Sequence, residues 1–296
     1  LYPEAATELE SAAKRNPDDQ RIMMDLGETY IHSGDKEKGV AAIQKAATNP
    51  VLLNNAAFIM ADNDLHLDDA LKDSQKAVTS VEDDTAGIKL DDLSLKDVQT
   101  VPTLSVFWDT LGWVYFRLGQ FEPAEKYLRA AFSLSQDPEI ADHLGQVYEK
   151  QGRKHDAAVA YSRALATEHA PEETRGRLEA LGADGRLGPG DKANSETLQN
   201  LRISKIPKFP GKPSKHASAE FFLLFAPGPK IVGVKFISGS EELREAGNVL
   251  STSKMEAVFP DDHPTQILRR GILDCEPEMS ECDFALIPPG SIRSLQ

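Results

Sequence analysis

The chain is poor in cysteine and tryptophan, with two of each in 296 residues, and its aromatic content is only 7%. Two cysteines cannot supply the four ligands of a structural zinc site. Long apolar runs are also missing. The longest candidate, residues 221–226, has the length of a strand and falls far short of the roughly 20 apolar residues of a membrane helix. The sequence therefore predicts no metal and no membrane insertion.

Motifs of catalysis and cofactor binding are absent as well. The chain has no Gly-x-Ser-x-Gly nucleophile motif, no phosphate-binding loop and no dinucleotide fingerprint. Its seven histidines are scattered and have no catalytic partner at short spacing. The acidic residues of 62–69 and 82–92 lack the spacing of an EF-hand, which favours solvated loops over calcium sites. We therefore predict a protein that is not an enzyme, with no catalytic residues and no cofactor.

Basic residues are outnumbered, with 33 Lys and Arg against 47 Asp and Glu. Residues 184–296 contain 14 basic and 15 acidic residues, which leaves 19 and 32 for residues 1–183. The first part thus has a net charge of −13 and the second of −1. Nucleic acid and anionic membranes both require a positive surface, so neither is expected as a partner.

One segment of 24 residues carries a strong pattern of aromatic, small and apolar positions. Its members are Trp108, Leu111, Gly112, Tyr115, Gly119, Ala124, Leu128 and Ala131. The segment resembles a tetratricopeptide repeat, which has a period of about 34 residues and consists of two packed helices. A single repeat cannot bury its own apolar face, so the resemblance implies neighbouring repeats.

Further copies precede and follow this segment. One runs from Met23 through Tyr30 to Ala46, one from Leu144 through Tyr148 to Ala164, and a degenerate copy includes Ala57 and Ala77. The resemblance covers residues 1–183 and implies an all-α solenoid. The expected parts are a half repeat (1–17), repeats at 18–49, 50–79, 104–136 and 138–170, a capping helix (171–182) and a polar insertion (80–103).

The half repeat has only the second-helix positions of the family. The face that its missing partner helix would cover includes Leu1, Ala5, Leu9 and Ala12. Three explanations of the half repeat are possible. The parent polypeptide extends further toward the N-terminus, or another molecule covers this face, or the segment is simply a helix that caps the solenoid.

The C-terminal part changes character. Residues 184–216 read as a basic linker rich in proline and glycine, with an extended path near Pro207, Pro210 and Pro213. Residues 217–296 predict a small α+β domain with an antiparallel sheet, so the whole chain is α+β. The expected strands are 219–225, 231–237, 255–259, 266–275 and 282–287, with a helix at 241–250. The layout of 220–250 resembles the C-terminal domain of TonB-type energy transducers, although Arg269, Arg270 and the cysteine pair depart from it.

The two cysteines, Cys275 and Cys282, flank a short polar segment between two predicted strands. If these strands pair as a hairpin, the cysteines face each other at a separation that a disulfide accepts. A structural disulfide indicates an oxidising compartment, so we expect an extracytoplasmic protein, periplasmic or extracellular. The alternative is a pair of buried thiols.

Binding is the remaining class of function. In a tetratricopeptide array the first helices form the concave face, and the corresponding residues here are Met24, Glu28, Ile31, Asp109, Trp113, Phe116, Arg117, Asp142, Gln146 and Glu149. The two aspartates disfavour an acidic peptide and favour a basic or apolar one. Trp113 and Phe116 are candidate anchors, unless they pack against the next repeat.

Three functions follow. The first is a non-enzymatic scaffold that binds a protein segment. The second is a structural subunit that binds other copies of itself head-to-tail and forms a homopolymer or filament. The third is the non-catalytic C-terminal part of a larger bacterial protein, as the chain also resembles multidomain proteins in which a transglutaminase-like region precedes such repeats.

Overall fold

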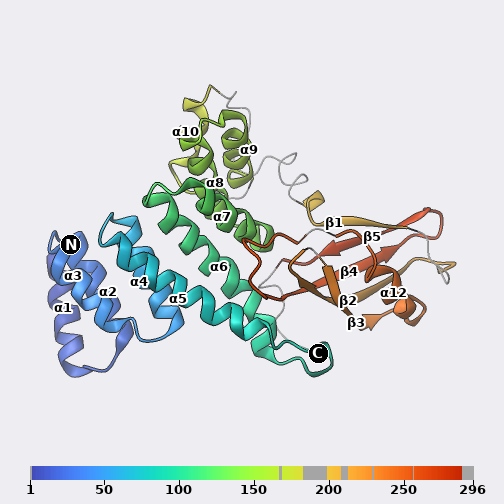
Figure 1. Cartoon of the computed structure of the whole chain (residues 1–296), viewed down its shortest axis with the longest axis horizontal. Coiled ribbons are helices and arrows are strands. Elements are labelled where there is room, and N and C mark those ends of the chain that lie inside the picture. Colours follow the sequence, from blue (N-terminus) through green and yellow to red (C-terminus); the bar gives the residue numbers. More distant parts are fainter. Residues whose placement is uncertain are drawn as a thin grey trace. The chain divides into compact units, whose positions relative to one another are not determined.

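The computed structural model describes residues 2–166, 169–182, 199–207, 213–228, 230–255 and 257–288. It has the expected α+β class, with helices followed by a five-stranded antiparallel sheet (Figure 1). The contacts divide the chain into two compact units, residues 1–81 with 107–124 and residues 82–106 with 125–296. Among the described helices, none is both long and apolar enough to cross a membrane.

Ten helices are described in the first part of the chain, and α2 packs against α3 and α8 against α9 across short turns. Their bounds are α1 (Tyr2–Arg15), α2 (Gln20–His32), α3 (Lys36–Ala46), α4 (Pro50–Asp62), α5 (Leu67–Thr85), α6 (Leu95–Arg117), α7 (Phe121–Ser135), α8 (Pro138–Lys150), α9 (Lys154–Ala164) and α10 (Thr174–Ala180). First helices begin at side-chain caps: Asn49 and Asp137 each accept a backbone N–H, and a proline follows at the first helical position. Proline fits there because that N–H has no intrahelical partner.

The turn inside each well-formed repeat depends on a glycine four residues after the signature tyrosine. Gly34, Gly119 and Gly152 have φ of 97°, 74° and 75°, the left-handed region that glycine enters without a steric penalty. In each turn the next residue donates its backbone N–H to the tyrosine carbonyl, at 2.9, 2.9 and 2.8 Å. This Schellman arrangement ends the first helix and reverses the chain.

The degenerate repeat makes the same turn without glycine. Asp64 adopts φ 53°, and the backbone N–H of Leu65 donates to the carbonyl of Met60 at 2.8 Å. Aspartate tolerates this region better than most residues. The turn is longer than in the other repeats because His66, also at positive φ, precedes the start of α5 at Leu67.

Small residues allow the helices of the first unit to pack closely. A Cβ atom on Gly27 of α2 would lie 2.5 Å from the Ile43 side chain and 2.9 Å from the Gly39 carbonyl of α3. Around this contact lies a core whose buried members include Met24, Ile43 and Trp113. A second, smaller cluster joins α1 to α2 through Ala6, Leu26 and Tyr30.

The sheet belongs to the second unit and has the strand order β1-β5-β4-β2-β3. The strands are β1 (Ile203–Pro207), β2 (Ala217–Ala226), β3 (Lys230–Gly239), β4 (Ile267–Cys275) and β5 (Glu281–Leu286). A short 3-10 turn, η2 (Glu241–Ala246), and the helix α12 (Gly247–Leu250) follow β3 and pack beside it (Figure 1). Leu243, Ala246 and Leu250 are fully buried, so this short helical segment covers apolar surface.

Two expectations about this part of the chain were wrong. Residues 255 and 257–259 form no strand, although their composition is apolar. Residues 203–207 of the predicted linker form the edge strand β1, which pairs antiparallel with β5. The predicted helix at 241–250 is present, as the 3-10 helix η2 followed by α12. Pro210 and most of the predicted linker lie outside the described residues.

The predicted insertion at 80–103 also differs from a solvated loop. Helix α5 extends to Thr85, the 3-10 turn η1 (Leu90–Asp92) follows, and α6 begins at Leu95 with Pro102 inside it. The Thr85 hydroxyl, which is fully buried, accepts a hydrogen bond from the backbone N–H of Gln266 at 2.9 Å. Lys235 Nζ of β3 donates to the Leu90 carbonyl at 2.6 Å. The insertion therefore packs against the sheet domain.

Candidate functional site

The predicted concave face is mostly buried. Met24, Ile31 and Trp113 are 5%, 4% and 5% exposed, and Asp109 and Asp142 are 8% and 2% exposed. Phe116, Arg117, Gln146 and Glu149 are half-buried, and Glu28 is exposed. In this structure the buried members pack inside the solenoid, which was the alternative interpretation of the aromatic pair.

Trp113 and Phe116 form a stacked pair near the C-terminal end of α6. Their ring centroids are 4.9 Å apart, and the Arg117 guanidinium lies 5.4 Å from the Trp113 ring. Arg117 Nε donates to Asp64 Oδ1 at 3.0 Å, and Nη1 donates to the Asp62 carbonyl at 3.2 Å. The negative charge of the α4–α5 turn is thus compensated by an arginine.

Asp142 accepts three hydrogen bonds in the second unit. The donors are Thr174 Oγ1 and Arg177 Nη1, each at 2.6 Å, and Gln146 Nε2 at 2.8 Å. Nearby, the Tyr161 hydroxyl donates to Glu149, and burial together with this bond raises the pKa of the tyrosine. Two of the predicted binding residues, Asp142 and Glu149, therefore attach α8 to α10 and α9, and a third, Gln146, bonds to Asp142 within α8.

The predicted self-assembly face on α1 is partly used for packing. Leu9 is half-buried against the cluster of Ala6, Leu26 and Tyr30. Ala5 is exposed and Ala12 half-buried, and Leu1 lies outside the described residues. Tyr2 remains 51% exposed, with its ring stacked 5.1 Å from the His32 ring.

Cys275 and Cys282 form the expected disulfide, with their Cα atoms 4.5 Å apart. They lie one position closer to the connecting turn than the Asp274–Asp283 pair of the β4–β5 hairpin, so they are opposite each other next to this turn. Both cysteines are buried, at 0% and 1% exposure.

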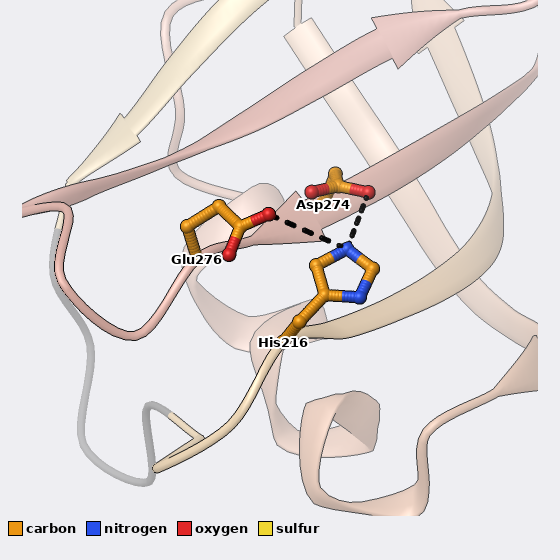
Figure 2. Close-up of side chains that lie close together, drawn as sticks. All are labelled: His216, Asp274 and Glu276. Atoms are coloured by element: carbon orange, nitrogen blue, oxygen red, sulfur yellow. Dashed lines mark hydrogen bonds and ion pairs between the residues drawn. The ribbon is translucent and has the colours of Figure 1, made fainter.

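A histidine and two carboxylates gather beside this disulfide (Figure 2). His216 Nε2 lies 3.2 Å from Asp274 Oδ2 and 3.8 Å from Glu276 Oε1. All three side chains are about half exposed, at 56%, 45% and 56%. An ion pair on the surface explains this geometry, so the cluster does not by itself indicate a metal centre.

The second unit has a cavity of about 560 Å³ between the helices α7–α9 and the sheet. Every described residue that lines it belongs to this unit. Phe132, Leu144, Phe225, Ile267 and Leu286 are among its apolar residues. A volume of this size is typical of small-molecule sites.

Among the described residues that line the cavity, five are arginines and one, Asp156, carries a carboxylate. Arg153 forms ion pairs with two nearby carboxylates. Its Nη1 lies 2.7 Å from Glu125 and its Nε lies 2.8 Å from Asp156. These bonds raise the pKa of Arg153, with Glu125 contributing most. Arg129 lies 3.8 Å from the same glutamate and is 59% exposed. The two acids of this region are therefore already paired.

The other three arginines, Arg163, Arg202 and Arg269, form no ion pair with any described residue. Arg163 lies 5.9 Å from the Phe132 ring, and its buried Nε has no hydrogen-bond partner among the described atoms. Arg202 precedes β1, and burial lowers the pKa of its guanidinium.

Arg269 is the most unusual of the three because it lies on the buried face of β4. It is 6% exposed, and its strand neighbours on that face, Ile267 and Leu273, are 0% exposed. Burial, and after it the positive charge of Arg202, lower the pKa of Arg269 to about 10. Its one hydrogen bond to a described residue joins Nη1 to the Ser133 carbonyl at 3.2 Å, in the last turn of α7. The adjacent Arg270 has an ordinary partner, Glu220.

One sign of this cavity is visible in the sequence. Arg269 and Arg270 interrupt an apolar strand, and alternation places one of them on the core face. The convergence of Arg163 and Arg202 on the same space depends on tertiary structure and has no local signal.

Comparisons with known proteins agree on the repeats. Tetratricopeptide-repeat family models match residues 1–50 and 106–138. No curated protein matches the chain significantly. Among solved structures, the thermophilic TPR protein TTC0263 of Thermus thermophilus is 21% identical, with 61% of this chain and 90% of that chain covered and a TM-score of 0.43. MamA is 18% identical, with 55% and 86% covered and a TM-score of 0.38. A chain of the APC/C hetero-tetramer Cut9-Hcn1 is 16% identical, with 61% and 39% covered and a TM-score of 0.37.

Proposed function

We propose that this protein is a non-enzymatic scaffold that binds protein segments through its tetratricopeptide repeats. The observation that carries the proposal is the match of residues 1–50 and 106–138 to repeat models, together with the helix pairs and glycine turns found there. Stacked repeats of this kind present extended binding surfaces. Catalysis has no comparable support in the described residues.

The exposed surface of the repeats favours a basic segment with apolar positions. Asp25, Glu28 and His32 lie on the exposed side of α2 at helical spacing, and the first 183 residues have a net charge of −13. Opposite charge accelerates association and favours one class of partner. The buried aromatic Trp113 is not part of the proposed surface.

An arrayed peptide library with graded lysine, leucine and glutamate content tests this proposal. We expect basic peptides with apolar positions to bind, and binding to weaken as salt rises. Glu28→Lys should reduce their affinity several-fold, whereas Glu179→Lys, the same charge change on the exposed side of α10, should leave it unchanged. Equal binding of glutamate-rich peptides would refute the proposed partner chemistry.

An extracytoplasmic location is the second part of the proposal. The Cys275–Cys282 disulfide supports it, because such bonds persist mainly in oxidising compartments. Trapping of free thiols in intact cells, followed by mass analysis, should find both cysteines unmodified. Alkylated cysteines would place the native protein in a reducing compartment.

Head-to-tail self-assembly is a second candidate function. It is favoured by the exposed apolar surface at the N-terminal end of the repeats, where Tyr2 is 51% exposed and Ala5 is uncovered. A molar mass that rises with concentration in light scattering, and a smaller rise in Tyr2→Glu, would support it. A constant mass of one chain would exclude it.

A further inference from the structure

We propose that the arginine-lined cavity of the second unit binds an organic anion, a carboxylate or phosphate group attached to an apolar body. The proposal is independent of the scaffold function, since the lining residues that the structure describes all lie outside the segments that form the first unit. It rests on an excess of unpaired positive charge, on the apolar remainder of the lining, and on walls that are held together without a ligand.

The positive charge is the first observation. Arg163, Arg202 and Arg269 reach the cavity from α9, from the segment before β1 and from β4. Their ordinary counter-ions are missing among the described residues, because Glu125 and Asp156 are bound to Arg153. A buried cation without a partner is costly, and an anion in the cavity would remove that cost.

Arginine also determines the kind of anion. Its planar guanidinium donates two parallel hydrogen bonds to a carboxylate or a phosphate, which gives both strength and orientation. One N–H group of Arg269 donates to the Ser133 carbonyl, and the guanidinium has further N–H groups that can donate to a ligand. Arg163 contributes an Nε that is buried and has no partner among the described atoms.

The remainder of the lining indicates an apolar body. Phe132 and Leu144 contribute from the helices, and Phe225, Ile267 and Leu286 from the strands. Free inorganic phosphate would leave this surface in contact with water, whereas a short alkyl chain or an apolar side chain would cover it. The volume of about 560 Å³ accommodates such a molecule.

The walls are attached to each other by contacts away from the arginines. The Tyr127 hydroxyl of α7 donates to Asp261 Oδ2 at 2.8 Å, ahead of β4. The start of the lining strand β4 is also held, because the backbone N–H of Gln266 donates to Thr85, which does not itself line the cavity. A site that exists before the ligand arrives loses little affinity to ordering.

Isothermal titration of the full chain with three ten-carbon probes tests the proposal. Decanoate and decyl phosphate carry the proposed group, and decanol carries the same apolar body without charge. We expect both anions to bind at least tenfold more tightly than decanol. Equal affinity for decanol would overturn the proposal, because the arginines would then contribute nothing. Inorganic phosphate is the probe that has the charged group but no apolar body. It should bind at least tenfold more weakly than decyl phosphate.

Two cavity variants and one control assign the effect to the arginines. Arg269→Met and Arg163→Met should each weaken decanoate binding at least tenfold, and the second variant serves if the first does not fold. Arg244→Met removes an arginine that pairs with Glu241 on the surface, and it should leave binding unchanged. Unchanged binding in both cavity variants would overturn the proposal.

The same titration distinguishes a free small molecule from the end of a peptide. An apolar tripeptide with a free C-terminal carboxylate is compared with its amidated form. Tighter binding of the free acid than of decanoate assigns the cavity to a chain end. Tighter binding of decanoate assigns it to a small amphiphile.

Discussion

Replacing Asp142 by alanine should destabilise the second unit by about 3 kcal/mol. The carboxylate is 2% exposed and accepts from Thr174, Arg177 and Gln146. The Thr174 hydroxyl is fully buried, so its loss of a partner costs about 1–3 kcal/mol. Arg177 is 31% exposed, so water would hydrate its guanidinium once the carboxylate of Asp142 is gone. Losing this ion pair should therefore cost about 1 kcal/mol, well below the cost of breaking a fully buried pair. The better helix propensity of alanine returns about 0.5 kcal/mol.

Thermal unfolding followed by circular dichroism measures this cost. For a unit of this size about 3 kcal/mol corresponds to a fall of about 6–12 °C in Tm. The control is Asp156→Ala, which removes an exposed carboxylate from Arg153 while Glu125 stays in place. That change should cost less than about 1 kcal/mol.

Similar Tm values for the two variants would refute the reasoning. They would mean that the bonds of Asp142 only replace equally good bonds to water. If Asp142→Ala instead kept the Tm but lost peptide binding, the original interpretation of this residue as part of the concave face would be correct.

The repeats could be predicted because their signals are local. A tyrosine followed four residues later by glycine specifies the end of a helix, since only the backbone of that turn is involved. The degenerate repeat shows the limit of such signals. Asp64 replaces glycine in the same turn and is compensated by Arg117, 53 residues away in the sequence.

The sheet domain was predicted less completely. Alternation and apolar runs identified β2, β3, β4 and β5, whose side chains divide between a buried and a less buried face. The edge strand β1 carries the pattern of a basic, proline-containing linker, and only its pairing with β5 makes it a strand. Residues 255 and 257–259 are apolar and are buried or half-buried, although they form no ladder.

The candidate site was predicted least. A face of a helix that lines a groove and one that packs on a neighbour have the same periodicity, so Met24 and Trp113 were assigned to binding although the structure buries them. The arginine cavity requires residues from α9, from the segment before β1 and from β4 to meet. Nothing in one sequence specifies which separate positive charges share a space.

Three further predictions concern stability. Gly145→Ala should lower the free energy of unfolding by about 1–3 kcal/mol, because its Cβ would lie 2.2 Å from the Tyr161 ring. Gly176→Ala has open space around the added Cβ and should be neutral or stabilising. Chemical denaturation of the two variants compares their stabilities. Reducing the Cys275–Cys282 disulfide should lower the unfolding free energy by about 2 kcal/mol through its short loop, and a double serine variant should not respond to reductant. The third concerns pH. Hydrogen bonds from Tyr30 and then Lys38 hold the pKa of Glu10 below its usual 4.5. A carboxyl with a lowered pKa stabilises the fold above its unfolded pKa and loses that contribution as pH falls through the folded value. Glu10→Gln should therefore be less stable than the parent at pH 6, and the difference should shrink below pH 4.5. A difference that is constant over this range would show that the charge of Glu10 is not what stabilises the contact between α1 and α2.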